Sequence, residues 1–147
     1  MSFSVKAVVT GPFQENSFIA WYSGSPDAVL VDPGDDDHLI IQMLEDNNLK
    51  PIAIINTHAH LDHIGAVHPL KEMYQIPFYL HEGEKFILDT YEETCRMFGI
   101  PPKQAPEVDI WFKEERKITV GDFSFNTVNT PGHTPGGACL KIENHIF

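Results

Sequence analysis

The chain has 147 residues, of which 42% are hydrophobic and 21% are charged, and this composition predicts one folded domain over residues 1–147 rather than a disordered chain. Ten basic and 21 acidic residues give a formal charge of −11 at pH 7. Because an acidic surface repels phosphate backbones and anionic lipids, we expect neither nucleic-acid nor membrane-surface binding.

No apolar run approaches the ~20 residues of a membrane span, and the first residues lack the pattern of a signal peptide. The two cysteines, Cys95 and Cys139, are too few and too far apart to indicate a disulfide framework. These features favour a reduced, cytoplasmic location.

The first half of the chain is predicted to alternate strands and helices. Alternating or continuous apolar residues predict strands at 3–9, 17–22, 28–31, 52–55 and 78–80. Apolar residues at helical spacing predict helices over 35–46, 62–74 and 82–98.

The rest of the chain is predicted to form strands at 117–120, 123–128 and 138–142, with a turn at Gly121-Asp122. Strands at both ends with helices between them are typical of a layered α/β or α+β fold.

The most informative segment is His58-Ala59-His60-Leu61-Asp62-His63. For a chain of this composition, a His-x-His-x-Asp-His match is expected by chance on the order of 0.002 times. Imidazole nitrogens and a carboxylate are suitable ligands for zinc and similar ions. Since residues i and i+2 at a strand end project to the same side, His58 and His60 are predicted to bind one ion. Asp62 and His63, at the start of the next helix, are predicted to lie across the same cleft, as a second sub-site.

A catalytic zinc site usually has three protein ligands plus water, so another ligand must come from elsewhere in the chain. His133 is the candidate, because the prolines and glycines of segment 130–137 would make a rigid loop around it. An exposed turn is the alternative interpretation of that segment.

With these motifs the sequence resembles the metallo-β-lactamase superfamily, and within it the glyoxalase II-like hydrolases. The matching segments are Thr57–Ala66, Val31-Asp32-Pro33-Gly34 and Thr130–Gly136. The resemblance implies an αββα sandwich with a metal site at the edge of its two sheets. It also implies that the chain is the N-terminal part of this sandwich, with the second half incomplete, since the family's bridging Asp and last His would follow Phe147.

Carried over by position, His58, His60 and His133 would hold the first metal, and Asp62 and His63 the second. Zinc is expected, as one or two ions per chain, and iron is the alternative. Asp62 would also orient the attacking water as a catalytic residue, whereas Asp32 would support the site without ligating. The resemblance implies hydrolysis of a thioester or ester carbonyl by metal-activated hydroxide, as in hydroxyacylglutathione hydrolase.

Other interpretations of the chain stay open. A mononuclear iron enzyme like the persulfide dioxygenases would use the same three histidines. An inactive, truncated metal-binding fragment would have the same motifs without turnover. The expected partner is a small molecule, with a glutathione thioester as the nearest guess, and a second copy of the chain could cover the open sheet as a homo-oligomer.

Overall fold

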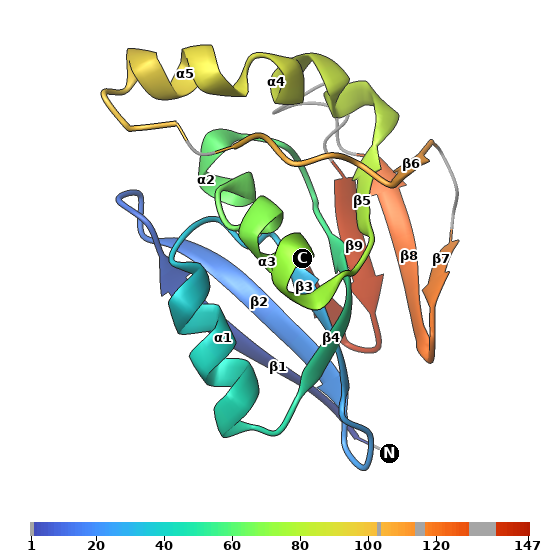
Figure 1. Cartoon of the computed structure of the whole chain (residues 1–147). Helices are drawn as coiled ribbons and strands as arrows, with labels where there is room; N and C mark the ends of the chain where they lie inside the picture. The colour runs from blue at the N-terminus through green and yellow to red at the C-terminus, as the bar shows by residue number, and fades with distance from the viewer. Residues whose placement is uncertain (1, 103, 114–116, 130–137) are drawn as a thin grey trace.

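The structure is a computed structural model, and it describes residues 2–102, 104–113, 117–129 and 138–147. Two sheets lie face to face, and helices cover the outer face of the first sheet (Figure 1). Three layers of the expected αββα sandwich are therefore present among the described residues, so the predicted fold class is confirmed.

Within the part of the chain that the structure describes, the first sheet has six strands in the order β1-β2-β3-β4-β5-β6. Its strands are β1 (Phe3–Thr10), β2 (Glu15–Tyr22), β3 (Asp27–Val31), β4 (Lys50–Ile55), β5 (Phe78–His81) and β6 (Ile110–Phe112). Strands β1, β2 and β3 pair antiparallel, whereas β3, β4, β5 and β6 pair in parallel. The carboxyl ends of four neighbouring strands consequently meet at one edge of the sheet, where ligand sites of parallel sheets usually lie.

The second sheet is antiparallel, and its described part has four strands in the order β10-β9-β8-β7. Its strands are β7 (Lys117–Val120), β8 (Phe123–Asn129), β9 (Ala138–Ile142) and β10 (His145–Ile146). The predicted turn at 121–122 joins β7 to β8, so this hairpin is confirmed.

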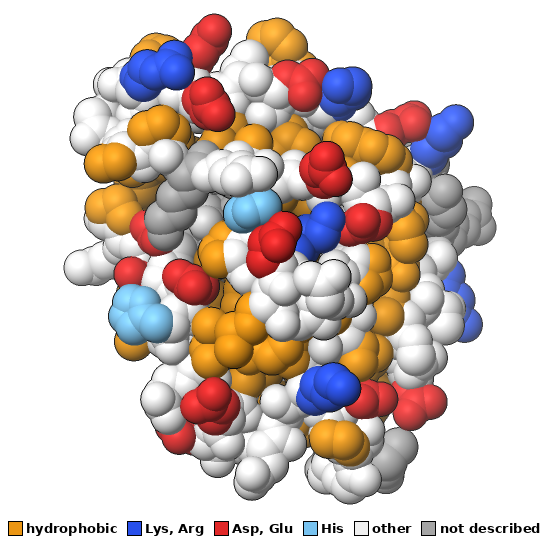
Figure 2. All heavy atoms as spheres, viewed as in Figure 1, with side chains coloured by type: hydrophobic (Ala, Val, Ile, Leu, Met, Phe, Trp, Pro, Cys, Tyr) orange, Lys and Arg blue, Asp and Glu red, His pale blue; other side chains and the backbone are white. Residues whose placement is uncertain are grey.

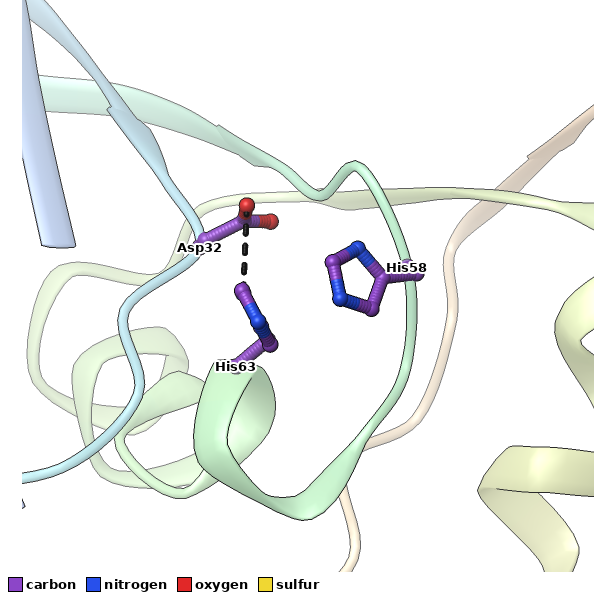
Figure 3. A group of neighbouring side chains, drawn as sticks. All are labelled: Asp32, His58 and His63. Carbon is purple, nitrogen blue, oxygen red and sulfur yellow. Dashed lines mark ion pairs between the residues drawn. The ribbon is translucent and has the colours of Figure 1, made fainter. Parts of the chain in front are cut away.

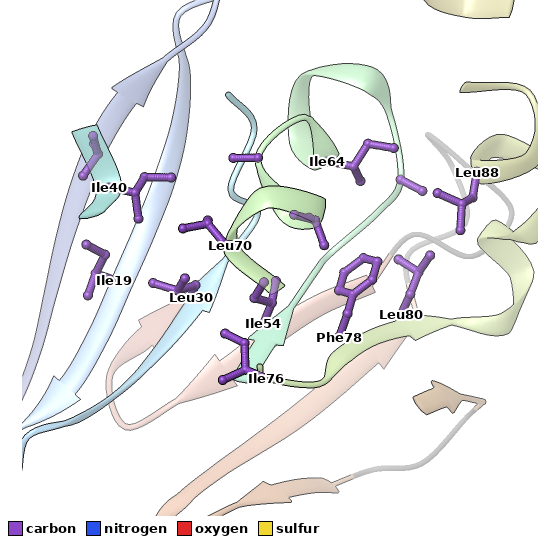
Figure 4. Close-up of a cluster of buried hydrophobic side chains, with 14 of the residues drawn as sticks. Ile19, Leu30, Ile40, Ile54, Ile64, Leu70, Ile76, Phe78, Leu80 and Leu88 are labelled. Carbon is purple, nitrogen blue, oxygen red and sulfur yellow. The ribbon is translucent and has the colours of Figure 1, made fainter. Parts of the chain in front are cut away.

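Side-chain alternation along the central strands separates two hydrophobic cores. Leu30 and Ile54 face the helices, and Figure 4 shows them with Leu70 and Phe78 in the first core. Their neighbours Val31 and Ile55 point to the opposite face and pack against the second sheet. Because helices cover one face of the first sheet and the second sheet covers the other, every residue of 52–55 can be apolar.

The helices are shorter and more numerous than the sequence predicts. They are α1 (Asp37–Asp46), α2 (Leu61–Ile64), α3 (Val67–Tyr74), the 3₁₀ turn η1 (Glu82–Glu84), α4 (Lys85–Asp89) and α5 (Tyr91–Met97). The single helix predicted over 62–74 is wrong, because the N–H of Ala66 donates to the carbonyl of Pro33 instead of continuing α2. The single helix over 82–98 is also wrong: the hydroxyl of Thr90 donates to the carbonyls of Phe86 and Ile87 where α4 ends.

Charge is mixed on the face of the molecule that Figure 2 shows. Acidic side chains are spread over this face, and the basic side chains lie singly or in small groups among them. Among the described residues, none of the helices has the length and apolar character that crossing a membrane requires.

Candidate metal centre

The candidate site lies where β3 and β4 end side by side. Asp32 directly follows β3, and the segment 56–60, here called the histidine loop, directly follows β4. Helix α2 continues from this loop and contributes Asp62 and His63. Figure 3 shows Asp32, His58 and His63 turned toward one another from these segments. The parallel pairing of β3 with β4 therefore brings together residues 26 or more positions apart in sequence.

Asp32 is a buried carboxylate that holds the start of the histidine loop. Its Oδ1 accepts the N–H of Thr57 at 2.7 Å, and its Oδ2 accepts the Thr57 hydroxyl at 2.6 Å. The backbone of Asp32 has a φ of 52°, a left-handed conformation that Asp tolerates better than most residues. Both carboxylate oxygens are thus engaged by the protein, which agrees with a supporting role for Asp32 rather than a ligand role.

The hydrogen bonds of Thr57 also fix which nitrogen of His58 is protonated. A threonine hydroxyl has one proton, and here it donates that proton to Asp32. The same Oγ1 lies 2.8 Å from Nδ1 of His58, so it must accept a proton from Nδ1. In a neutral ring this leaves the lone pair on Nε2, which is the arrangement that carboxylate-supported metal-binding histidines show.

His63 is 9% exposed and has carboxylates on both sides of its ring. Its Nδ1 lies 3.3 Å from Oδ2 of Asp32, while its Nε2 lies 3.6 Å from Oδ2 of Asp62 and 3.8 Å from Oε1 of Glu15. Burial lowers the pKa of His63, but these three carboxylates, Asp32 foremost, outweigh burial and raise the pKa above its usual value. The site consequently favours a positive charge at this position.

Two further polar side chains hold the backbone of the histidine loop. The fully buried carboxylate of Glu84 accepts the N–H of Ala59, the residue between His58 and His60, at 3.0 Å. The amide of Asn56 donates to the carbonyl of His63 at 2.7 Å, and to that of His58 at 3.3 Å. Glu84, which follows β5, and Asn56, which belongs to the loop itself, therefore fix the loop backbone without a bound ligand.

Close backbone packing fixes α2 against the loop that contains Asp32. A Cβ on Gly34 would lie 2.1 Å from the carbonyl oxygen of Asp62, and a Cβ on Gly65 would lie 2.2 Å from that of Gly34. Neither position has room for a side chain. The two glycines thus allow the backbone contact that brings Asp62 and His63 toward Asp32.

These residues fit a divalent metal ion. Two groups each bring three potential donor atoms within 4.8 Å of one another. They are Asp32–His58–His63, in which both oxygens of Asp32 already accept hydrogen bonds from Thr57, and Glu15–Asp62–His63. Among the described residues, Nδ1 of His63 is buried and makes no hydrogen bond of regular geometry, but it faces Oδ2 of Asp32 at 3.3 Å, which leaves Nε2 as the nitrogen open to an ion. Imidazole and carboxylate donors suit zinc and iron.

The histidines and the aspartate predicted from the sequence lie close together as far as the structure describes them. The rings of His58 and His60 are 5.2 Å apart between centroids, and those of His58 and His63 are 3.8 Å apart. Asp62 lies beside His63. His133 lies outside the described residues, so its role as a ligand stays a prediction, as do the ligand roles of the other four residues.

The sequence motifs did not identify Glu15 and Glu84 as residues of the site. Glu15 begins β2 behind a four-residue turn, and Glu84 belongs to the short turn η1. Neither residue belongs to a motif, and each reaches the site only through tertiary contacts.

Comparison with known proteins agrees with this geometry. A family model described as the metallo-beta-lactamase superfamily matches residues 10–147. The chain belongs to the metallo-β-lactamase superfamily. Members of this superfamily are usually metal-dependent hydrolases, with zinc or iron as the metal.

Three members of the superfamily are similar to the chain in sequence, and for two of them a crystal structure can be superposed. The chain is 33% identical over 135 residues to "Hydroxyacylglutathione hydrolase GloC" of Haemophilus influenzae, covering 90% of this chain and 63% of that protein. The crystal structure of the BLEG-1 B3 metallo-β-lactamase superposes with a TM-score of 0.84 at 37% identity, covering 93% and 66% of the two chains. The di-iron form of TTHA1623 superposes with a TM-score of 0.79 at 31% identity, covering 92% and 66%. The chain spans 63–65% of the length of the first curated relatives that it matches.

Proposed function

We propose that the chain forms the metal-binding part of a hydrolase that cleaves a thioester, with a glutathione thioester as the nearest substrate. The observation that supports this most directly is that the ring of His63 lies beside both His58 and Asp62 at the carboxyl edge of the parallel strands. The similarity to the Haemophilus influenzae hydroxyacylglutathione hydrolase supports the substrate class.

In this proposal His58, His60 and His133 hold the first ion, and Asp62 and His63 hold the second. A bound ion would supply a water acidified toward neutral pH and would polarise the substrate carbonyl. Asp62, whose side chain is 25% exposed, would accept a hydrogen bond from the attacking water and so orient it. Asp32 and Thr57 would keep the His58 ring in the tautomer with its lone pair on Nε2.

The direct test compares the chain with its His58→Ala variant in zinc binding and in release of thiol from S-lactoylglutathione. We expect His58→Ala to weaken zinc binding at least tenfold, because even the loss of a supporting group costs about that much. His38→Ala is the matched control, because His38 is an exposed histidine outside the cluster. Equal zinc binding by the chain and by His58→Ala would contradict the proposal.

Metal identity has to be tested in the same preparation, because the di-iron form of TTHA1623 favours iron as an alternative. Elemental analysis of the purified chain distinguishes zinc from iron. Oxygen consumption with a persulfide substrate, in place of thiol release, would support the iron dioxygenase interpretation instead. Metal binding without either activity would support an inactive fragment.

A further inference from the structure

We propose that Glu15, together with Asp62 and His63, holds a second divalent cation beside the ion assigned to the histidine loop. This inference rests on the metal-binding part of the proposed function and adds a ligand from β2. The carboxylate of Glu15 comes from a different segment of the chain than the other candidate ligands, which all lie in 58–63 or near 133.

One ligand atom from each of Glu15, Asp62 and His63 lies within 4.8 Å of the other two. Oxygens of Asp62 and Glu15 lie 3.6 and 3.8 Å from Nε2 of His63, which is too long for hydrogen bonds. Two ligands each bound about 2.1 Å from a tetrahedral zinc ion lie about 3.4 Å apart. The observed distances therefore match a coordination shell better than a hydrogen-bonded ion pair.

The His63 ring is oriented for this second ion. Its Nδ1 side faces the buried carboxylate of Asp32 at 3.3 Å, which leaves Nε2 directed at Asp62 and Glu15. Metal-binding histidines commonly have this arrangement, with a carboxylate behind one nitrogen and the ion in front of the other. His63 is nine-tenths buried, so the direction of its Nε2 is set by packing.

Glu15 is held in place by its strand. Thr10 pairs with Glu15 in the β1–β2 register, and Ser17, two residues further on the same face, accepts the N–H of Gly34 at 3.0 Å. The hydroxyls of Thr10 and Ser17 lie 2.9 Å apart and are buried. The start of β2 is thereby fixed to the loop that follows β3, and the Glu15 side chain is directed at α2 from a defined position.

Two carboxylates meet on the same side of the His63 ring. Oxygens of Asp62 and Glu15 lie within 4.8 Å of one another and of His63. Two ionised carboxylates at this separation repel each other, and a cation held between them would offset the repulsion.

The test is zinc titration of the metal-free chain by calorimetry, with Glu15→Gln as the variant and Glu72→Gln as the matched control. Glu72 is an exposed glutamate on α3, outside the cluster. We expect two ions per chain in the wild type and in Glu72→Gln. In Glu15→Gln we expect the first affinity within twofold of the wild type and the second weakened at least tenfold.

Thermal unfolding of the metal-free proteins separates this role from a structural one. If Glu15 serves as a ligand, Glu15→Gln leaves the melting temperature of the metal-free chain unchanged or higher, and reduces only the increase that zinc produces. An ion pair with His63 as the sole role of Glu15 predicts the opposite pattern, with a lower metal-free melting temperature and an unchanged zinc effect.

Binding of one zinc ion by the wild type, or identical titrations of the wild type and Glu15→Gln, would overturn the inference alone. No zinc binding by the wild type would overturn both the inference and the proposed function. Two ions, a weakened second ion in Glu15→Gln and no thiol release would overturn the thioester hydrolase proposal while supporting the role of Glu15.

Discussion

The two sides of the His63 ring are built differently. On the inner side, Asp32 has a side chain only 6% exposed, and both of its oxygens accept hydrogen bonds from Thr57. On the outer side, Asp62 and Glu15 are 25% and 33% exposed and lie beyond hydrogen-bond distance of the ring. The difference indicates that the inner side fixes the orientation of the His63 ring, whereas the carboxylates on the outer side are available for the cation that we propose.

The largest expected effect comes from removing the inner carboxylate. Asp32→Ala leaves the buried N–H and hydroxyl of Thr57 without their acceptor, so we expect a loss of about 3 kcal/mol in the free energy of unfolding. Asp32→Asn is the control, because it keeps one acceptor oxygen and tolerates the left-handed backbone, and it should lose about 1 kcal/mol. Urea unfolding measures both variants, and equal losses would contradict the inner-side role.

A smaller effect is expected at Glu84, which fixes the histidine loop through one hydrogen bond to Ala59. Glu84→Ala should cost about 2 kcal/mol in unfolding free energy, since it leaves a buried N–H without an acceptor. It should also weaken zinc binding, because the backbone between His58 and His60 is released. Glu84→Gln retains an acceptor oxygen and should bind zinc more tightly than Glu84→Ala, whereas equally weak binding would show that the hydrogen bond is not the cause.

The smallest effect is expected at Asp109, a carboxylate outside the site. Its loss of unfolding free energy can be compared with the losses at Asp32 and Glu84. Burial raises its pKa, but a hydrogen bond from Lys71 and one from the N–H of Phe78 outweigh burial, so the pKa lies below its usual value of 3.8. The stabilisation is therefore present above pH 3.8 and lost as the pH falls through the lower folded-state pKa.

Because Asp109 is 43% exposed, Asp109→Asn should cost under about 1 kcal/mol at neutral pH. Its difference from the wild type should shrink progressively in urea unfolding carried out at pH values falling below 3.8, as Asp109 becomes protonated first in the unfolded and then in the folded state. A difference that grows on acidification would show that Asp109 stabilises the fold in some other way.

The sequence was sufficient to predict most strands of the two sheets and the close approach of His58, His60 and His63. Alternation predicted β1, β2 and β3 to within two residues at each end, and the histidine motif predicted a cluster at the end of β4. These signals are local, because they depend on side-chain periodicity and on residues a few positions apart.

The features that the sequence did not predict depend on tertiary contacts. The break between α2 and α3 follows from the close approach of Gly65 to Gly34. The spacing of apolar residues along the sequence does not reveal this contact. Strand β6 has three residues and exists by pairing with β5. Glu15 reaches His63 because of the hairpin register, so no motif could have identified it.

That register has a consequence for how the site could change. Side chains along a strand alternate between faces, so a glutamate at position 16 instead of 15 would lie on the other surface of the sheet. The histidine motif, Asp32 and both glycines would remain untouched by such an exchange. If Glu15 holds the second ion as we propose, exchanging two neighbouring residues at the start of one strand is enough to convert a two-ion centre into a one-ion centre.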